Sequence, residues 1–472
     1  PKVSEFQKNS IKKILEGKST VLSAPTASGK TEAFVIPILQ KILQNEEHKG
    51  TFCIIAYPTR ALAADQVSKI NKYAEACGLG NCAFRLDGSV PTGSRPAIVE
   101  KCPKIIVTTI DFIHWQLTLQ SISASLFKQA KIFALDEAHS YSGFFGSNVY
   151  FVIKRLKKFL KNPQFIAASA TLDNELEFCQ ELFDEKMELV KGKSRKKSLR
   201  QYVIRPTDIT HVTASNKIVS MFKETDNKFL SFFNSRADAE NQSSRLKDGK
   251  KPLMVEVHRS GISNRVRQDT EFRMKEGDLE GLCCTSTLEL GIDIGSVTGV
   301  SSIFTNDLDN FIQRQGRAGR KGTDAYSVMI LRSNDPFSHY YSSHIEEYFA
   351  QKNIFHIQKD NPIIKKNQEI FEKADSYGLN PDVKESLKSS ADMMDAKQLL
   401  RKYSIRGMGE SVSGINENGH EIDSTPIPGA YTKLFHGGIH KVNSVTYVSQ
   451  GVKEEKNNWG DIEYKTKLIQ RD

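Results

Sequence analysis

Residues 21–31 read Val21-Leu-Ser-Ala-Pro-Thr-Ala-Ser-Gly-Lys-Thr31, and the rest of the chain is organised around them. An apolar, β-prone run enters this loop of small residues, and a helical pattern from Glu32 to Leu43 follows it. Backbone N–H groups of such a loop, with the positive N-terminus of the helix, bind phosphates. Ala24 stands where the generic GxxxxGK[ST] pattern has its first glycine. The stretch predicts a nucleoside triphosphate site, in which Lys30 reaches the β- and γ-phosphates and Thr31 ligates Mg²⁺.

Composition sets the broad class of the protein. A chain of 472 residues is too long for one core, so two to four domains are expected. The formal net charge of +10 favours a polyanionic partner, nucleic acid first. Seven cysteines form no CxxC pair, which indicates reduced thiols in an intracellular protein, cytoplasmic or nucleoid-associated. There is no apolar run of ~18 residues, so no membrane span is expected.

Four further apolar runs each end in a polar signature. They are residues 51–57 before Pro58 to Ala63, 105–107 before Thr108-Thr109, 131–135 before Asp136 to His139, and 164–168 before Ser169 to Thr171. Apolar strands that alternate with helices indicate a parallel sheet covered on both faces. Such an α/β sheet binds its ligand at the carboxyl ends of its strands, where these signatures fall.

The acidic pair Asp136-Glu137 has a defined task in this setting. Asp136 can hold Mg²⁺, and Glu137 can polarise a water for in-line attack on the γ-phosphate. An acidic pair after a strand is otherwise often a helix cap. The four matching strand ends favour the catalytic interpretation.

A second α/β unit follows, with predicted strands at 229–233, 253–257 and 281–285. Polar residues again follow each strand, and the unit ends in Gln313-Arg-Gln-Gly-Arg-Ala-Gly-Arg320. Arginines among small residues are what an arginine finger needs, because a fixed fork of donors must approach the γ-phosphate closely. The predicted boundaries are 1–190 and 206–338 for the two α/β domains, 191–205 for a basic linker, and 339–472 for an accessory module, helical and then β-rich.

The basic linker has two interpretations. Residues 190–205 contain seven Lys or Arg and no acid. Such a run is usually a solvated connection, and the alternative is a linker that also touches a phosphate backbone. Gln7 is similarly open between a surface glutamine and an amide that reads an adenine edge.

Taken together, the motifs resemble those of a superfamily 2 helicase. Phe6-Gln7 is similar to the adenine-side motif, Ala24 to Thr31 to Walker A, and Asp136 to His139 to a DEAH box. The later signatures resemble motifs Ia, Ib and III (SAT) in the first domain and motifs IV, V and VI in the second. They are Pro58 to Ala63, Thr108-Thr109, Ser169 to Thr171, Phe233 to Arg236, Thr285 to Asp293 and Gln313 to Arg320.

The subfamily resemblance rests on longer stretches. Asp136 to Ser147 resembles the DExH-x-Y-x-G-x-x-G-S pattern of the MrfA/YprA and Hrq-type DNA-repair helicases. Leu288 to Gly295 is similar in those proteins and in the Lhr group. One departure is that the MrfA/Hrq group usually ends in a four-cysteine zinc module, whereas no cysteine follows Cys284 here.

This resemblance implies two tandem RecA-like parallel-sheet domains that close on ATP and Mg²⁺. It implies catalytic roles for Lys30, Asp136, Glu137, Gln313, Arg317 and Arg320, with Thr31 and Asp136 on the metal. It implies nucleotide contacts from Phe6, Gln7, Ala24, Thr26, Ser28, Gly29, Lys30, Thr31, Glu32, Gly291 and Asp293. It implies strand contacts from Thr59, Arg60, Thr108, Thr109, Ser235, Arg236, His258, Arg259, Thr285 and Ser286.

The function that follows is an ATP-dependent 3′-to-5′ DNA helicase or translocase in DNA repair, a monomer that acts on single-stranded or forked DNA. An RNA helicase or RNA-dependent ATPase is the alternative, because a DEAH box with SAT occurs there too. A non-catalytic nucleic-acid clamp is a third possibility, against which Lys30, Glu137 and Arg320 argue.

Overall fold

The computed structural model describes residues 3–471 except 26–27, 120, 171–172, 193–198, 226, 250, 261, 263, 290–293, 320–323, 353, 380–390, 408–410, 420, 427–429, 432, 443–444 and 457–461. The chain forms two compact units. Unit 1 comprises residues 1–195 and 352–408, and unit 2 comprises residues 196–351 and 409–472. Of residues 339–472, which the sequence predicted to be an accessory module, residues 352–408 belong to unit 1, whereas residues 339–351 and 409–472 belong to unit 2.

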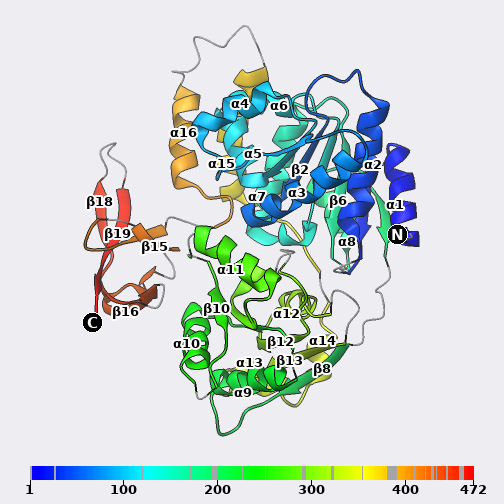
Figure 1. Ribbon diagram of the computed structural model, residues 1–472. Coiled ribbons are helices and arrows are strands. Elements are labelled where there is room, and N and C mark those ends of the chain that lie inside the picture. Colours follow the sequence, from blue (N-terminus) through cyan, green and yellow to red (C-terminus); the bar gives the residue numbers. More distant parts are fainter. Residues whose placement is uncertain are drawn as a thin grey trace. The chain divides into compact units, whose positions relative to one another are not determined.

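Unit 1 is built on a seven-stranded parallel sheet with the order β3-β4-β2-β5-β6-β1-β7. Figure 1 labels β2 and β6 of this sheet. The strands are β1 Thr20–Ser23, β2 Cys53–Tyr57, β3 Ala83–Arg85, β4 Ile105–Thr109, β5 Ile132–Leu135, β6 Gln164–Ser169 and β7 Glu188–Lys191. In register, Leu22 pairs with Ala168 and Ile55 with Val107. Each of the five central strands is buried along its whole length, as an apolar run in a doubly covered sheet predicts.

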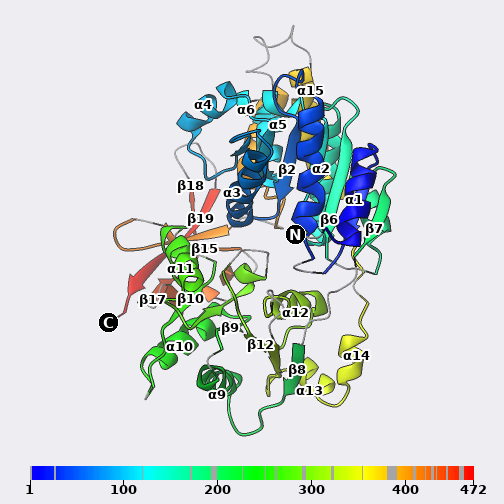
Figure 2. The same cartoon turned by 45° about the vertical axis from the view of Figure 1, so that its right-hand side comes forward.

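Helices cover both faces of this sheet, and successive strand residues alternate between two cores. Ile54 and Ala56 lie in one core, whereas Cys53, Ile55 and Tyr57 lie in the other. The helices are α1 Glu5–Leu15, α2 Lys30–Gln44, α3 Arg60–Ala76, α4 Arg95–Glu100, α5 Ile110–Leu119, α6 Ile122–Phe127, α7 Gly143–Lys157 and α8 Glu175–Phe183. Figure 2 shows α1 beside β7 at the end of the sheet.

The chain returns to unit 1 after residue 351. The Gly143 N–H donates to His356 O at 2.9 Å, and Asn174 Nδ2 donates to Phe355 O at 2.7 Å. Two helices follow, α15 Pro362–Leu379 and α16 Ala391–Lys402, and α15 packs on α5 and α7. Unit 1 thus carries a helical layer from the C-terminal part of the chain in addition to its own fold.

Unit 2 contains a second parallel sheet with the order β10-β11-β9-β12-β13-β8. Its strands are β8 Leu199–Ile204, β9 Phe229–Phe232, β10 Val255–His258, β11 Gly281–Cys284, β12 Gly299–Ile303 and β13 Ala325–Ile330. Its helices are α9 His211–Glu224, α10 Arg236–Lys247, α11 Asn264–Glu276, α12 Leu308–Gln315, α13 Pro336–Tyr341 and α14 Ile345–Phe349. The stretch expected as a basic linker contributes a strand at each end, because Lys191 closes β7 and residues 199–204 form β8.

The C-terminal part of unit 2 is a mixed sheet with the order β15-β14-β19-β17-β16, with β18 paired to β19. The strands are β14 Ser411–Ile415, β15 Glu421–Pro426, β16 His436–Val442, β17 Val445–Gln450, β18 Lys453–Lys456 and β19 Ile462–Gln470. Its small core contains Val412, Leu434 and Leu468. The two parallel-sheet domains and the mixed C-terminal part confirm the predicted fold class. Among the described residues, no helix is long and apolar enough to cross a membrane.

Candidate active site

The loop between β1 and α2 presents the residues expected at a phosphate site. Gly29 is the N-cap of α2 and has a φ of +82°, a conformation that suits glycine. Lys30 Nζ donates to Ala24 O at 2.6 Å, so the ammonium group lies over the loop it is expected to serve. Ser28 Oγ is buried and has no hydrogen-bond partner among the described residues. A hydroxyl in this state is suited to a hydrogen bond with a bound ligand. Thr26 lies outside the described residues.

Helix α1 is tied to this loop through Gln7. Its Oε1 accepts from the Ser4 N–H at 3.0 Å in a capping box, and its Nε2 donates to Gly29 O at 3.2 Å. Phe6 is buried and packs in the same core as Ala24. The structure therefore gives Gln7 a positioning contact to the loop, and adenine recognition by Phe6 and Gln7 stays a prediction.

Glu32 in the first turn of α2 has a partner of its own. Its Oε1 accepts from Tyr73 Oη at 2.8 Å, so the carboxylate bridges α2 and α3. Burial first, and then the Glu32 carboxylate, raise the pKa of Tyr73 to about 12. The neighbouring Thr31 lies in the first helical turn next to Lys30.

The acidic pair lies at the end of β5. The Glu137 N–H donates to Asp136 Oδ1 at 2.8 Å, and Glu137 has a φ of +50°. Burial, and then the charge of Glu137, raise the pKa of Asp136 to about 7, whereas Lys30 acts in the opposite direction. A buried carboxylate that is this costly to ionise would gain from a nearby cation. The donor set of Thr31 and Asp136 therefore fits Mg²⁺, a hard cation that prefers oxygen ligands.

His139 connects the acidic pair to the SAT residues. Its Nδ1 accepts from the Ala170 N–H at 3.2 Å, which leaves the ring proton on Nε2. Nε2 lies 3.6 Å from Glu137 Oε2, and Ser169 O in turn accepts from the Ala24 N–H at 3.3 Å. Thr171 lies outside the described residues. Motifs I, II and III thus form one hydrogen-bonded group at the carboxyl edge of the sheet.

The residues of unit 1 that are expected to contact a nucleic-acid strand differ in their exposure to solvent. Thr59 caps α3 by accepting from the Leu62 N–H at 3.3 Å, and Arg60 is exposed beside it. Thr108 is buried and donates to Leu86 O at 2.7 Å, and Thr109 Oγ1 accepts from the Phe112 N–H at 3.4 Å. The side chains of Thr108 and Thr109 therefore stabilise the loop itself. A contact to a nucleic-acid strand would come from the backbone of this loop.

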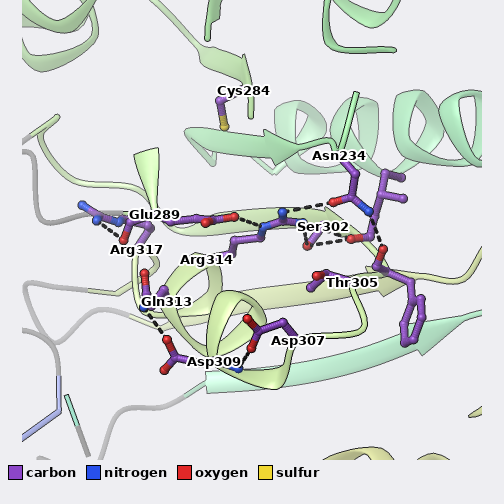
Figure 3. A network of polar contacts seen from close by, with 12 residues as sticks. Asn234, Cys284, Glu289, Ser302, Thr305, Asp307, Asp309, Gln313, Arg314 and Arg317 are labelled. Carbon is purple, nitrogen blue, oxygen red and sulfur yellow. Dashed lines mark hydrogen bonds and ion pairs between the residues drawn. The ribbon is translucent and has the colours of Figure 1, made fainter. Parts of the chain in front are cut away.

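In unit 2, motif VI contains a buried arginine, Arg314, that the sequence pattern alone did not single out. Arg314 Nε donates to Glu289 Oε1 at 2.7 Å, and Nη2 donates to Asn234 Oδ1 at 3.0 Å (Figure 3). Arg317 donates to Glu289 O, and Gln313 Nε2 donates to Asp309 Oδ2 at 2.6 Å. Burial raises the pKa of Glu289, and Arg314 opposes that shift. Gly291, Asp293 and Arg320 lie outside the described residues.

The His258-Arg259 pair is inside unit 2, not on its surface. The side chains are 1% and 2% exposed. His258 Nε2 lies 2.9 Å from Glu271 Oε1 and Nδ1 lies 2.9 Å from Thr287 Oγ1, whereas Arg259 Nε donates to Glu240 Oε1 at 2.7 Å. The two side chains join β10 to α10, α11 and motif V inside unit 2, and their contact with a nucleic-acid strand stays a prediction.

The remaining residues expected to contact nucleic acid also follow strands of the second parallel sheet: Ser235-Arg236 follow β9, and Thr285-Ser286 follow β11. Arg236 Nη1 donates to Asp423 Oδ1 at 3.0 Å, and Ser235 precedes it at the start of α10. Thr285 is buried, whereas Ser286 is exposed at the end of β11. Among the described residues, no group of three His, Cys, Asp or Glu could hold a metal ion, and the seven cysteines are free thiols.

Comparison with known proteins places these motifs in context. The family described as DEAD/DEAH box helicase matches residues 4–179, and the family described as helicase conserved C-terminal domain matches residues 211–322. The chain is 32% identical over 358 residues to the uncharacterized ATP-dependent helicase MJ1574 of Methanocaldococcus jannaschii, covering 73% of this chain and 52% of that protein. It is 30% identical over 355 residues to the uncharacterized ATP-dependent helicase YprA of Bacillus subtilis, and the match covers 71% of this chain and 47% of that protein.

Solved helicase structures are also similar to this chain. The structure of the DUF1998 helicase MrfA bound to DNA and AMPPNP matches with a TM-score of 0.79 at 25% identity, over all of this chain and 70% of that one. The helicase Lhr of Mycobacterium smegmatis, bound to single-stranded DNA and AMP-PNP, matches with a TM-score of 0.65 at 25% identity, over 78% of this chain and 51% of that one. The chain spans about half the length of the two curated relatives above.

Proposed function

The chain belongs to the superfamily 2 helicases of the MrfA, YprA and Hrq type, and on this premise we propose that it is an ATP-driven motor on single-stranded DNA. One observation carries the proposal. Lys30, the Asp136-Glu137 pair and His139 lie on a single edge of the first sheet, and hydrogen bonds join this edge to Ala170. DNA as the partner is supported by the MrfA and Lhr structures, which contain it.

Each residue of this edge has a task in hydrolysis. Lys30 would exchange its loop carbonyls for phosphate oxygens, and backbone N–H groups at the start of α2 would hold the same anion. Glu137 would orient the attacking water and accept its proton. A bound Mg²⁺, held by Thr31 and Asp136, would supply charge stabilisation on the phosphates.

Unit 2 would complete the reaction with its arginines. Arg317 and Arg320 would act on the γ-phosphate, Gln313 would help to place the water, and Gly291 and Asp293 would sense the nucleotide. Hydrolysis would then depend on domain movement, which couples ATP turnover to motion along a strand. Movement from 3′ to 5′ and a role in DNA repair inside the cell are the finer parts of the proposal, and they follow the family resemblance.

The proposal is tested by measuring the ATPase rate without nucleic acid, with single-stranded DNA and with single-stranded RNA at equal salt. We expect strong stimulation by DNA, and a grip on phosphates should weaken as salt is raised. Lys30→Ala should abolish turnover and leave strand binding largely intact. Stimulation by RNA alone would make the protein an RNA-dependent ATPase, and turnover retained in Lys30→Ala would refute the assigned site.

A further inference from the structure

Arg406 contacts three segments of unit 1 that carry helicase motifs. Nη2 donates to Pro58 O at 2.6 Å, at the start of the segment similar to motif Ia. Nε and Nη2 donate to the two carboxylate oxygens of Asp111 at 2.7 and 2.6 Å, two residues after motif Ib. The guanidinium carbon lies 4.3 Å from the ring centroid of Phe145, in the first turn of the helix that follows the DEAH box.

These contacts converge on neighbouring strand ends. β2 and β4 are paired in the sheet, with Tyr57 opposite Thr109. The chain leaves β2 through Pro58 into α3 and leaves β4 directly into α5, so Arg406 bridges the starts of two helices. The N-terminus of a helix is where backbone N–H groups bind phosphate. The distance between two such N-termini must fit the spacing of phosphates along a strand.

Asp111 makes the charge of Arg406 matter at this edge. Its carboxylate lies in the first turn of α5. There it interacts favourably with the positive end of the helix dipole, but it would repel a phosphate bound at the same place. The bidentate pair with Arg406 offsets that charge and fixes the side chain. The same guanidinium also donates to the Pro58 carbonyl, and a lysine ammonium lacks the planar fork that pairs with both carboxylate oxygens of Asp111.

We propose that Arg406 is a positioning residue for the strand grip of unit 1, because it holds the starts of α3 and α5 at a fixed spacing and cancels the charge of Asp111. This inference rests on the proposed function. It assigns to the segment after α16 a role in DNA-dependent turnover, in addition to packing.

The test compares Arg406→Ala, Arg406→Lys and Asp111→Ala in the whole chain. The control is Lys158→Ala, which removes an exposed ion pair between Lys158, at the end of α7, and Glu372 of α15. The readouts are the single-stranded DNA concentration at half-maximal ATPase and the rate at saturating DNA. We expect Arg406→Ala to raise the half-saturating concentration about tenfold and to lower the saturated rate less than about twofold.

Arg406→Lys should fall between Arg406→Ala and the wild type, whereas Lys158→Ala should match the wild type. The double variant Arg406→Ala with Asp111→Ala should bind DNA no more weakly than Arg406→Ala alone, because each change removes the same interaction, the Arg406–Asp111 ion pair. Additive losses, a lysine variant equal to the wild type, or a wild-type affinity in Arg406→Ala would overturn the inference. A wild-type protein without DNA stimulation would instead refute the proposed function.

Discussion

Arg155 of α7 and Asp375 of α15 form a buried bidentate ion pair, with Nε to Oδ2 at 2.5 Å and Nη2 to Oδ1 at 2.9 Å. The guanidinium also donates to His114 Nδ1 at 2.8 Å and to Thr118 Oγ1 at 2.7 Å, both on α5. Since buried charge is stable only when its partners are complete, this network specifies where α15 packs. The C-terminal helices are therefore attached to unit 1 by matched polar groups as well as by apolar contact.

Asp375→Ala should destabilise unit 1 strongly. It leaves the Arg155 charge buried without its carboxylate, a change that typically costs about 3–5 kcal/mol. Replacing both members, as in Arg155→Met with Asp375→Leu, should cost less, because no charge is then left unpaired. Lys158→Ala, which breaks an exposed pair, should cost at most about 1 kcal/mol. Urea unfolding followed by the fluorescence of Trp115 on α5, in a Trp459→Phe background, would rank these variants; equal midpoints for Asp375→Ala and Lys158→Ala would contradict the prediction.

The stability of unit 1 should fall in acid through His114. Burial, and then Arg155, hold the pKa of His114 well below its ordinary value of 6.5. Below pH 6.5, His114 binds a proton in the unfolded chain but not in the folded chain, so the free energy of unfolding decreases as the pH falls. The loss from this group between pH 7.5 and 5.5 should be on the order of 1 kcal/mol.

His114→Asn isolates this contribution, because asparagine can accept from Arg155 and does not titrate. Burial raises the pKa of Asp375, which gives a contribution of opposite sign, but that group is present in both proteins. Urea unfolding at both pH values should therefore show a smaller acid loss in the variant. The same pH dependence in both proteins would exclude His114 as its source.

The packing of α15 also shows where sequence prediction fails. Its inward stripe is Ile364, Gln368, Phe371 and Asp375, at helical spacing. Two of these four residues are polar because they face Arg155 and Asn148, so hydrophobic periodicity does not reveal the helix. The central strands were predicted because burial on both faces produces continuous apolar runs. The edge strand β8 was not, since it is largely exposed and lies in a basic stretch.

For the candidate site, sequence patterns identified the motifs but not the direction of each side chain. Lys30, Asp136 and His139 follow strand ends, and the topology brings those ends together. His258 and Arg259 follow a strand end in the same way, yet they face inward because Glu271 and Glu240 lie on helices packed against them. Arg314 was missed for the same reason: its buried partner Glu289 is defined by tertiary structure alone.

Gly29→Ala should impair nucleotide binding more than an ordinary glycine substitution. The left-handed backbone costs an L-residue about 1–2 kcal/mol, and a Cβ there would also collide with the Gln7 amide. Gly17, with a φ of +80° and no atom within 4 Å of a Cβ, is a matched control that experiences the strain alone. We expect Gly29→Ala to weaken the binding of a fluorescent ATP analogue about tenfold and Gly17→Ala to leave it unchanged. Similar binding by the two variants would show that the Gln7 contact does not shape the loop.

His139→Ala should uncouple ATP turnover from DNA. The substitution leaves the Ala170 N–H without its acceptor and removes the ring proton that faces Glu137, so the SAT segment loses its connection to the acidic pair. A lost hydrogen bond of about 1–1.5 kcal/mol corresponds to a roughly tenfold fall in the ratio of DNA-stimulated to basal ATPase. His139→Asn places an acceptor near the Nδ1 position and should retain more of this ratio. Glu137→Gln, which removes the base, should instead lower both rates by about 10²-fold or more. If His139→Ala lowered both rates in equal proportion, the residue would serve the chemical step and not the coupling.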